Sequence, residues 1–272
     1  MMYFYCFFIG FSRSSATENF CEVPTECLPW LYRFNLILRY ISLYNPDVIC
    51  LQEVDHFEQI KESLSGMGYV GDFMVRISSS VQHGVALFYK TMKFDIIETF
   101  KNYLHEENGE VGSQGLLVNL LKDKKTNKEV LVGVVHLKAK RAFSERRQAQ
   151  TRSALDIFKT ISEKHPVVPL VWGGDFNGED NEPFYKSIMD SLLRLRSSYK
   201  KVLGDEPVFT TWKIRPDCIE KHTIDYIWFS EEKIDAKDVL LPMSDDLVPK
   251  SCYPSLDHPS DHILLCADFN FL

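Results

Sequence analysis

The chain has 272 residues, of which 45% are hydrophobic and 25% are charged, and its formal net charge is −7 at pH 7. This size and composition are typical of one large folded domain or two small ones. The negative charge argues against a protein that coats long nucleic acids, because such proteins attract phosphates with a basic surface. A small pocket that binds phosphate groups locally remains compatible with this charge.

The N-terminal residues 1–11 are apolar but too few to span a membrane. No positive charge precedes them, which disfavours a signal peptide, so we expect either a first strand of the domain or a misplaced gene start. No linker or repeat interrupts the rest of the chain. We therefore expect an atypical N-terminal segment over 1–18, which could replace the first strand, followed by a single domain over 19–272.

Seven scattered cysteines, an odd number without a Cys-x-x-Cys pair, make a zinc site improbable. Cys50 and Cys266 lie in apolar runs and are expected to be small core residues. This cysteine usage indicates a reducing, intracellular compartment, the cytoplasm or alternatively the mitochondrion. We expect a monomer that makes no contact with membranes.

Apolar periodicity predicts alternating helices and strands in the first half of the chain. Asn45-Pro46 ends the first helix, because the residue before a proline avoids the α region. The predicted elements are a helix at 29–44, a strand at 47–52, a helix at 57–64, a hairpin of 85–89 with 94–100, and a hairpin of 116–121 with 129–137 that turns through the charged run 122–128.

The second half begins with a long predicted helix and continues with buried strands. The predicted elements are helices at 141–164 and 182–193 and strands at 167–172, 223–229 and 262–269. Hairpins mixed with helices predict an α/β fold in which two mainly antiparallel sheets pack face to face, with helices outside.

The sequence Gly-Gly-Asp-Phe-Asn at 173–177 follows directly on the apolar strand at 167–172. Residues i and i+2 of a strand share a face, so Asp175 and Asn177 are expected to point the same way. They lie just past the C-terminal end of a strand, where α/β sheets place their chemistry. A carboxylate and an amide aimed at one point suit a divalent metal, a water molecule and a phosphate.

Glu53 and His136 also follow apolar strand runs directly. Glu53 is either a strand-end acid in water or a ligand of Mg²⁺, since hard cations prefer carboxylate oxygens. His136 is either a core histidine with satisfied hydrogen bonds or part of a site. Each residue alone leaves both alternatives open.

Asp225 lies inside the apolar run 223–229, and a charge buried there needs a partner. His262 beside it would be held in one tautomer and made more basic, as in a dyad that activates water. A structural ion pair is the alternative. In a regular strand Asp261 would face away from His262, so both reach one site only if this segment is a loop.

Basic and aromatic residues lie close in sequence to these acids. Solvated side chains are the ordinary interpretation of the lysines and arginines, but beside carboxylates they could clamp substrate phosphates. Trp212 and Phe176 are core residues or, alternatively, faces on which a base stacks. The basic candidates are Lys138, Lys140, Lys213 and Arg215.

Six motifs together resemble the endonuclease/exonuclease/phosphatase family, and within it the deadenylase-like branch, from about residue 19 to 272. The motifs are Leu-Gln-Glu-Val-Asp (51–55), Val-His-Leu-Lys-Ala-Lys (135–140), Gly-Gly-Asp-Phe-Asn (173–177), Thr-Thr-Trp-Lys-Ile-Arg (210–215), Thr-Ile-Asp-Tyr-Ile-Trp (223–228) and Pro-Ser-Asp-His (259–262).

The resemblance implies a four-layer α/β sandwich that catalyses Mg²⁺-dependent phosphoester hydrolysis. It also implies a role for each matching position. Glu53 would bind the metal, with Asp261 nearby, and Asp175 would orient or activate the attacking water. Asn177 and His136 would hold the phosphate, and His262, oriented by Asp225, would complete the phosphate site. Other substrate phosphates would be held by Lys138, Lys213 and Arg215.

The sequence departs from the family pattern in three places. Residues 1–18 contain neither residue of the Trp-Asn pair that supplies a metal-site Asn in the family. The loop at 76–84 is shortened, and Arg76 stands in for a lysine. Lys140 replaces an arginine, which keeps the charge but loses the bidentate fork.

Three functions are compatible with these motifs. The first is removal of the 2′-phosphate from NADP⁺ or NADPH, favoured by the basic set and by an acidic surface unsuited to long RNA. The second is a 3′–5′ poly(A) exoribonuclease in mRNA decay, with poly(A) RNA as its partner. The third is a catalytically impaired relative, since the metal-site Asn is missing.

Overall fold

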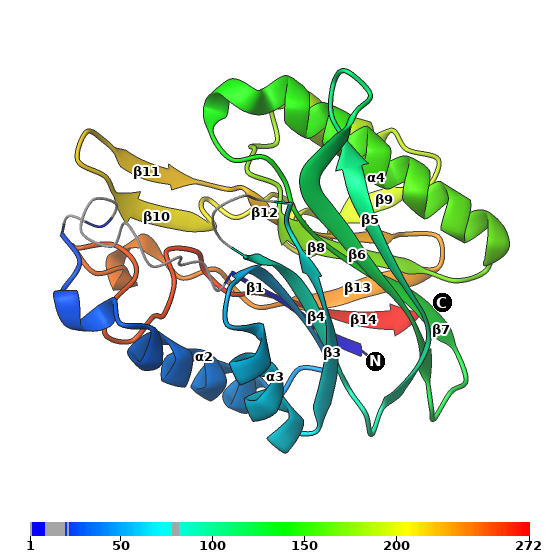
Figure 1. Ribbon diagram of the computed structural model, residues 1–272, viewed down its shortest axis with the longest axis horizontal. Coiled ribbons are helices and arrows are strands. Elements are labelled where there is room, and N and C mark those ends of the chain that lie inside the picture. The colour runs from blue at the N-terminus through cyan, green and yellow to red at the C-terminus, as the bar shows by residue number, and fades with distance from the viewer. Residues whose placement is uncertain (1, 9–19, 21, 78–81) are drawn as a thin grey trace.

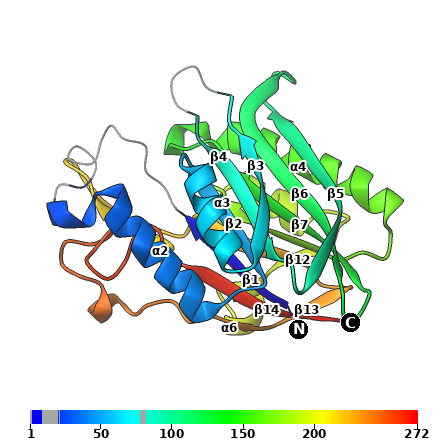
Figure 2. The ribbon, with the colours of Figure 1, turned by 60° about the horizontal axis from the view of Figure 1, so that its bottom comes forward.

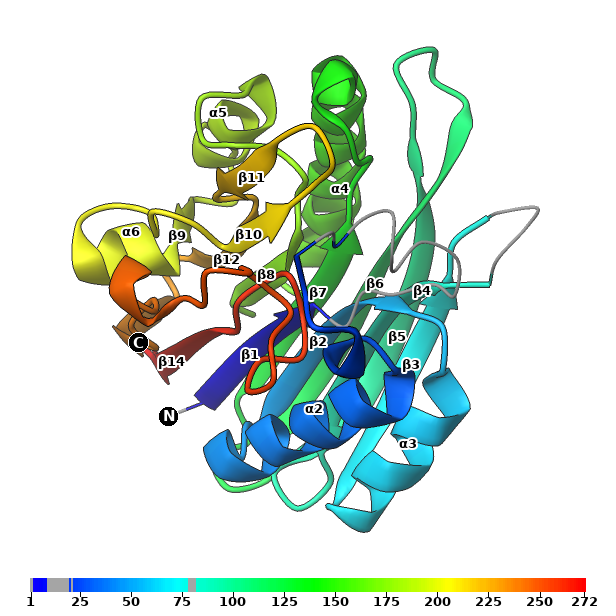
Figure 3. The ribbon, with the colours of Figure 1, turned by 90° about the vertical axis from the view of Figure 1, so that its left-hand side faces the viewer.

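The computed structural model describes residues 2–8, 20, 22–77 and 82–272. Two six-stranded sheets lie face to face in this part of the chain, and a two-stranded ribbon lies at one end of them (Figure 1). Helices cover the outer face of each sheet, so the layers run helix, sheet, sheet, helix (Figure 3). The expected four-layer α/β sandwich is confirmed.

The first sheet has the strand order β13-β14-β1-β2-β4-β3. Only β1 and β2 run parallel, and the other neighbours are antiparallel. β1 begins beside the end of β14, so the two ends of the described chain lie close together (Figure 2). The strands are β1 (Met2–Phe8), β2 (Val48–Val54), β3 (Tyr69–Val75), β4 (Gly84–Lys90), β13 (Ile234–Val239) and β14 (Leu265–Phe271).

The second sheet has the order β5-β6-β7-β8-β12-β9, and only β7 and β8 run parallel. The separate ribbon pairs β10 with β11. The strands are β5 (Phe94–His105), β6 (Val111–Asp123), β7 (Glu129–His136), β8 (Leu170–Asp175), β9 (Leu195–Ser197), β10 (Thr211–Ile214), β11 (Ile219–His222) and β12 (Asp225–Ser230).

The helices α2 and α3 pack on the first sheet, and α4 and α5 pack on the second. Pro24 and Pro29 precede the first two helical segments, and α5 carries a proline in its first turn, where its missing N–H costs nothing. The helices are η1 (Thr25–Cys27), α2 (Trp30–Tyr44), α3 (Phe57–Gly66), η2 (Arg141–Phe143), α4 (Ser144–Lys164), α5 (Pro183–Met189), α6 (Ser198–Leu203) and η3 (Asp245–Leu247).

Three apolar layers hold the described part together. The central layer lies between the sheets and includes Val132, Val134 and Ile227, while the alternate residues of the same strands face the helices. Leu131 and Trp172, for example, pack against Phe158 of α4. Strands buried on both faces read as continuous apolar runs, which is why β2, β7 and β8 were predicted from the sequence.

One predicted hairpin is wrong. Residues 85–89 and 94–100 are strands, but β4 lies in the first sheet and β5 in the second. The short turn at 91–93 carries the chain from one sheet to the other. The hairpin of β6 and β7 is confirmed, with Leu116 opposite Val135.

The strand register of the second sheet places three polar residues in one row. His136 lies beside Asp175 in the β7–β8 pair, and Asp175 lies beside Asp225 in the β8–β12 pair. These residues are separated by tens of positions in the sequence, and strand pairing alone brings them together at the ends of three neighbouring strands.

Five cysteines have side chains that the structure describes, and none of these five forms a disulfide. Cys50 and Cys266 are buried core residues, as expected. Among the described residues, none of the helices is sufficiently long and apolar to cross a membrane. Asn19, the first asparagine of the chain, lies outside the described residues.

Candidate active site

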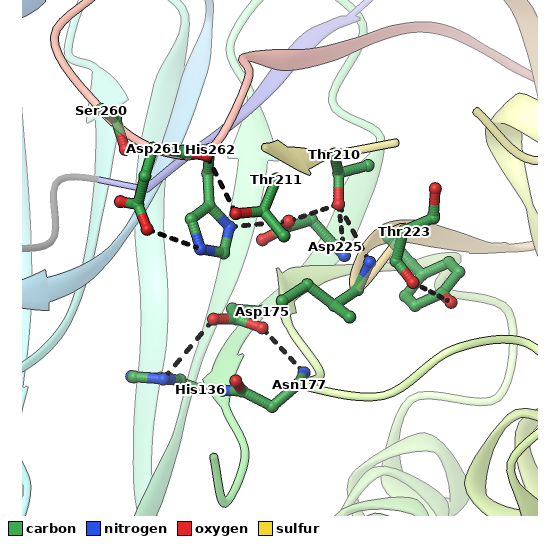
Figure 4. A network of polar contacts seen from close by, with 12 residues as sticks. His136, Asp175, Asn177, Thr210, Thr211, Thr223, Asp225, Ser260, Asp261 and His262 are labelled. Carbon is green, nitrogen blue, oxygen red and sulfur yellow. Dashed lines mark hydrogen bonds and ion pairs between the residues drawn. The ribbon is translucent and has the colours of Figure 1, made fainter. Parts of the chain in front are cut away.

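The candidate active site lies where the row His136, Asp175 and Asp225 meets the loop before β14 (Figure 4). The loop carries Asp261 and His262, and Figure 4 shows both side chains directed toward this row. The first sheet adds Glu53 from the end of β2, whose Oε1 is 3.9 Å from Nε2 of His136. The site therefore forms between the two sheets.

Asp175 and Asn177 lie side by side at the end of β8. The backbone of Asn177 has a φ of 53°, a left-handed conformation that Asn adopts more readily than most residues. Its N–H donates to Oδ1 of Asp175 at 2.7 Å, and its Nδ2 donates to the carbonyl of Leu137 at 3.1 Å. Phe176 between them is fully buried against Trp172, so it is a core residue and offers no face to a base.

Burial raises the pKa of Asp175 well above its usual value, and the neighbouring Asp225 raises it further. A carboxyl with a raised pKa accepts a proton more readily near neutral pH. This property suits a group that takes a proton from water.

Asp225 and His262 form a buried pair, with Nδ1 of His262 2.8 Å from Oδ2 of Asp225. The hydroxyl of Thr210 donates to the same carboxylate oxygen at 2.6 Å and accepts the N–H groups of Ile224 and Asp225. Burial lowers the pKa of His262, but Asp225 and Asp261 outweigh it and raise this pKa to about 9. His262 is therefore an imidazolium at neutral pH.

Asp261 and His262 both reach the site because their segment is a loop, as the sequence required. Thr211 donates its hydroxyl, and Trp212 its N–H, to the main-chain carbonyl of Asp261 at 2.9 and 3.2 Å. The ammonium of Lys213 lies 2.5 Å from Oδ2 of Asp261. Burial raises the pKa of Asp261, but Lys213 and His262 lower it to about 2 overall.

Glu53 sits at an irregularity in the pairing of β2 with β4, between Leu51 and Val54. Its φ of 52° turns it out of the regular alternation, which is how a bulge re-aims a side chain. Burial and the charge of Asp261 raise the pKa of Glu53. Nε2 of His136 also lies 3.6 Å from Oδ2 of Asp175. Burial lowers the pKa of His136 to about 3, and the neighbouring His83 and Arg76 act in the same direction.

These donors fit a divalent metal ion. Burial raises the pKa values of Glu53 and Asp175, and a nearby cation would oppose this effect and keep both carboxylates ionised. Ligand atoms of Asp175, Asp225 and His262 also lie within 4.8 Å of one another, but Asp225 already hydrogen-bonds Nδ1 of His262. Glu53 and Asp261 offer further carboxylate oxygens, the ligands that hard cations prefer, and Oδ2 of Asp261 also pairs with Lys213.

The basic candidates fall into two groups. Arg76 and His136 line one small cavity, and the charges of Arg76 and Lys140 are among those that lower the pKa of Lys138, after burial. Lys213 is buried beneath Asp261, while Nε of Arg215 lies 3.3 Å from Glu220. The charges of the first group (Arg76, Lys138, Lys140) therefore act on one another, with Glu106 opposing them at Lys138, whereas the second group (Lys213, Arg215) is paired with acids.

Trp212 is not a free face for a base, because Nζ of Lys221 lies 3.9 Å from the centre of its ring. Two supporting residues escaped the sequence analysis. Thr210 fixes Asp225, and Nε2 of His258 contacts the carbonyl of His262 at 2.8 Å. The Thr-Thr pair before Trp212 was visible in the sequence, but no spacing pattern distinguishes a supporting hydroxyl from any other threonine.

Comparison with known proteins identifies the family of the chain. Residues 27–262 match the model of the Endonuclease/Exonuclease/phosphatase family. The chain is 35% identical to Homo sapiens Nocturnin over 266 residues, covering 93% of this chain and 61% of that protein. It is 24% identical over 321 residues to the CCR4-Not complex 3′-5′-exoribonuclease subunit Ccr4 of Yarrowia lipolytica, covering 91% and 45%.

The structure of the human Nocturnin catalytic domain with a bound sulfate anion superimposes with a TM-score of 0.83 at 30% identity, covering 100% of this chain and 94% of that one. The chain spans about three fifths of the length of the human relative. The family match covers well over half of the chain and includes Glu53, Asp175 and His262. The chain belongs to the endonuclease/exonuclease/phosphatase family.

Proposed function

We propose that this protein is a Mg²⁺-dependent phosphatase that removes the 2′-phosphate from NADP⁺ or NADPH. The observation that carries the proposal is the row of His136, Asp175 and Asp225 facing Glu53, with His262 held as an imidazolium. The similarity to human Nocturnin supports it, since the catalytic domain of that protein binds a sulfate anion, which resembles phosphate in shape and charge.

The reaction adds water to the phosphomonoester and releases inorganic phosphate and the free 2′-hydroxyl. Asp175 orients the attacking water and receives its proton, since its pKa is raised. Asn177 and the neutral His136 hold phosphoryl oxygens by hydrogen bonds. The charged His262, fixed by Asp225, stabilises the negative charge that develops on the phosphoryl group and the leaving oxygen.

Glu53, with Asp261 nearby, would hold Mg²⁺. The bound ion would supply positive charge that polarises the phosphoryl group. Lys213 keeps Asp261 ionised and thus able to face a cation.

The basic groups serve the rest of the substrate. Arg76, Lys138 and Lys140 would bind phosphates other than the one being cleaved, because their positive charges act on one another. Lys213 and Arg215 would hold further substrate phosphates beside the acids with which they pair. The product is then a dinucleotide with one phosphate fewer, which binds this surface less tightly.

A poly(A) 3′–5′ exoribonuclease is the second candidate. The similarity to Ccr4 of Yarrowia lipolytica, an exoribonuclease subunit by name, favours it. The net charge of −7 weighs against it, because a groove that follows several nucleotides needs a basic stripe and aromatic stacking faces. Phe176 is buried and Trp212 is covered by Lys221, so neither of these rings supplies such a face.

Incubation with NADPH and Mg²⁺, followed by an assay of inorganic phosphate, tests the proposal. A labelled oligo(A) in a parallel reaction tests the alternative by its stepwise shortening. Glu53→Gln should abolish phosphate release, whereas Glu98→Gln, at an exposed acid on β5, should leave it unchanged.

Folded protein that releases no phosphate from NADPH would refute the phosphatase. Shortening of oligo(A) would then identify the nuclease. If both reactions fail and millimolar Mg²⁺ does not raise the melting temperature, the chain is the impaired relative, since a ligand that binds the native state stabilises it.

A further inference from the structure

Lys138 and Lys140 lie in a loop between β7 and η2, and lysine side chains in a loop lose much entropy when they bind a phosphate. A loop binds phosphates well only if its main chain is already fixed. Residues 138–140 lie in no strand or helix, and one short-range main-chain bond holds Lys140, from the N–H of Phe143 to its carbonyl at 3.1 Å. Buried side chains of α4 provide the missing contacts.

Arg147 is fully buried and reaches this loop from the first turn of α4. Its Nη1 donates to the carbonyls of Lys138 at 3.0 Å and Lys140 at 2.8 Å, and its Nη2 donates to the carbonyl of Arg141 at 3.5 Å. Glu182 accepts the remaining N–H groups, with Nε to Oε2 at 2.9 Å and Nη2 to Oε1 at 2.6 Å. All five donors of the guanidinium are thereby matched.

Gln150 holds the same loop from the next turn of α4. Its Oε1 accepts the N–H of Lys138 at 3.0 Å, so both main-chain groups of Lys138 bind side chains of one helix. The Nε2 of Gln150 lies 3.2 Å from Glu106 and 3.3 Å from Gln114, which fix it in turn.

The backbone of Lys140 requires such support. Its φ of 82° and ψ of 136° lie in a region that residues other than glycine rarely adopt. A non-glycine residue stays there only where its surroundings determine the conformation. The carbonyl of Lys140 makes the shorter of the two bonds to Nη1 of Arg147, so the guanidinium holds the strained residue directly.

We propose that Arg147, with Gln150 and Glu182, is the positioning residue that sets the affinity of the 138–141 loop for substrate phosphates outside the metal site. Arg147 itself touches no substrate. The proposal rests on the proposed function, because it names the part of that site which selects a substrate with several phosphates. A simple ion pair would explain the contact with Glu182 but not the three carbonyls gathered on one guanidinium.

Arg147→Lys tests the proposal, since lysine keeps the charge but has three donors in place of a planar fork. With NADPH, which carries three phosphates, KM should rise about tenfold or more while kcat changes by less than about threefold, because binding is lost and chemistry is not. With adenosine 2′-monophosphate, which carries only the cleaved phosphate, kcat/KM should stay within about threefold.

Glu182→Gln is the second variant, and it should raise KM for NADPH in the same direction by a smaller factor. Ile161→Ala is the matched control, because it damages the buried face of the same helix far along the chain from the loop. It should lower the melting temperature without changing KM for NADPH. An unchanged KM in Arg147→Lys, or an equal loss with both substrates, would overturn the proposal.

A binding measurement separates this proposal from the proposed function. Inorganic pyrophosphate is titrated calorimetrically into the protein in EDTA, and Arg147→Lys should weaken its binding about tenfold relative to the unaltered chain. This result is expected even if the chain hydrolyses neither substrate, which would refute the phosphatase alone. Pyrophosphate that binds both proteins equally, or neither, would refute the positioning role.

Discussion

Replacing Asp225 by asparagine should turn His262 from an imidazolium into a neutral imidazole at neutral pH. Asp225 is the strongest of the groups that raise the pKa of His262 from its usual 6.5 to about 9. This difference of about 2.5 units corresponds to about 3 kcal/mol of stabilisation of the charged ring. Burial lowers the pKa of His262, so without the carboxylate its value should fall below 6.5.

The pH dependence follows from the sign of this shift. Because the folded-state pKa is raised, its contribution to the free energy of unfolding is complete below pH 6.5 and is lost as the pH rises through about 9. The unaltered, metal-free protein should therefore lose about 3 kcal/mol from this group across that window. Asp225→Asn should show no such loss.

Two assays follow the change directly. Titration of the imidazole signals by NMR in EDTA gives the pKa of His262, and urea denaturation at about pH 6 and pH 9.5 gives the stability difference. Phosphate release should fall by about 10²-fold or more, since a charged group aimed at the transition state is lost. Asp190→Asn, at an exposed acid on the surface, is the control. A variant His262 that still titrates near pH 9 would refute the reasoning.

Three further predictions concern the same site. Thr210→Val should lower the free energy of unfolding, measured by urea denaturation, by about 2 kcal/mol, because a carboxylate oxygen and two buried N–H groups lose their partner. A change below about 0.5 kcal/mol would contradict this prediction. Lys213→Met should lower the free energy of unfolding of the metal-free protein by about 3 kcal/mol or more, since Asp261 is left buried without the ammonium of Lys213. Equal stability of the two proteins would show that the ion pair contributes nothing. His136→Gln should reduce phosphate release by about 10²-fold while unfolding stays within about 1 kcal/mol; unchanged release would remove His136 from the site.

Local patterns predicted the strands with long apolar runs but missed β3, β9, β10, β11 and β13, and they did not give all the pairings. The apolar runs of β4 and β5 were identified, yet their pairing was wrong, because a short turn can join strands of two sheets as easily as two strands of one. The β6–β7 hairpin was predictable since its charged turn lies between two apolar runs. Pairing depends on the packing of whole sheets, which a short window of sequence does not contain.

The residue types of the site could be predicted, whereas its geometry could not. Asp175 and Asn177 lie side by side as expected, but strand alternation is not the cause, because β8 ends at Asp175 and Asn177 has a left-handed backbone. The bulge that re-aims Glu53 has no sequence signal. The buried Phe176 shows that a residue between two polar positions faces the opposite side, into the core. Arg147 has an unremarkable place in a helical pattern, and only the fold reveals that it holds a loop of the site.

The most direct test of the account is hydrolysis of NADPH in ¹⁸O-labelled water with Mg²⁺, followed by mass spectrometry of both products. We expect NADH and inorganic phosphate that carries the label, because water held by Asp175 attacks phosphorus, and we expect neither product from Asp175→Asn. Unlabelled phosphate, absence of NADH, or an Asp175→Asn variant that keeps the full rate would contradict the assignment of this site to phosphate hydrolysis.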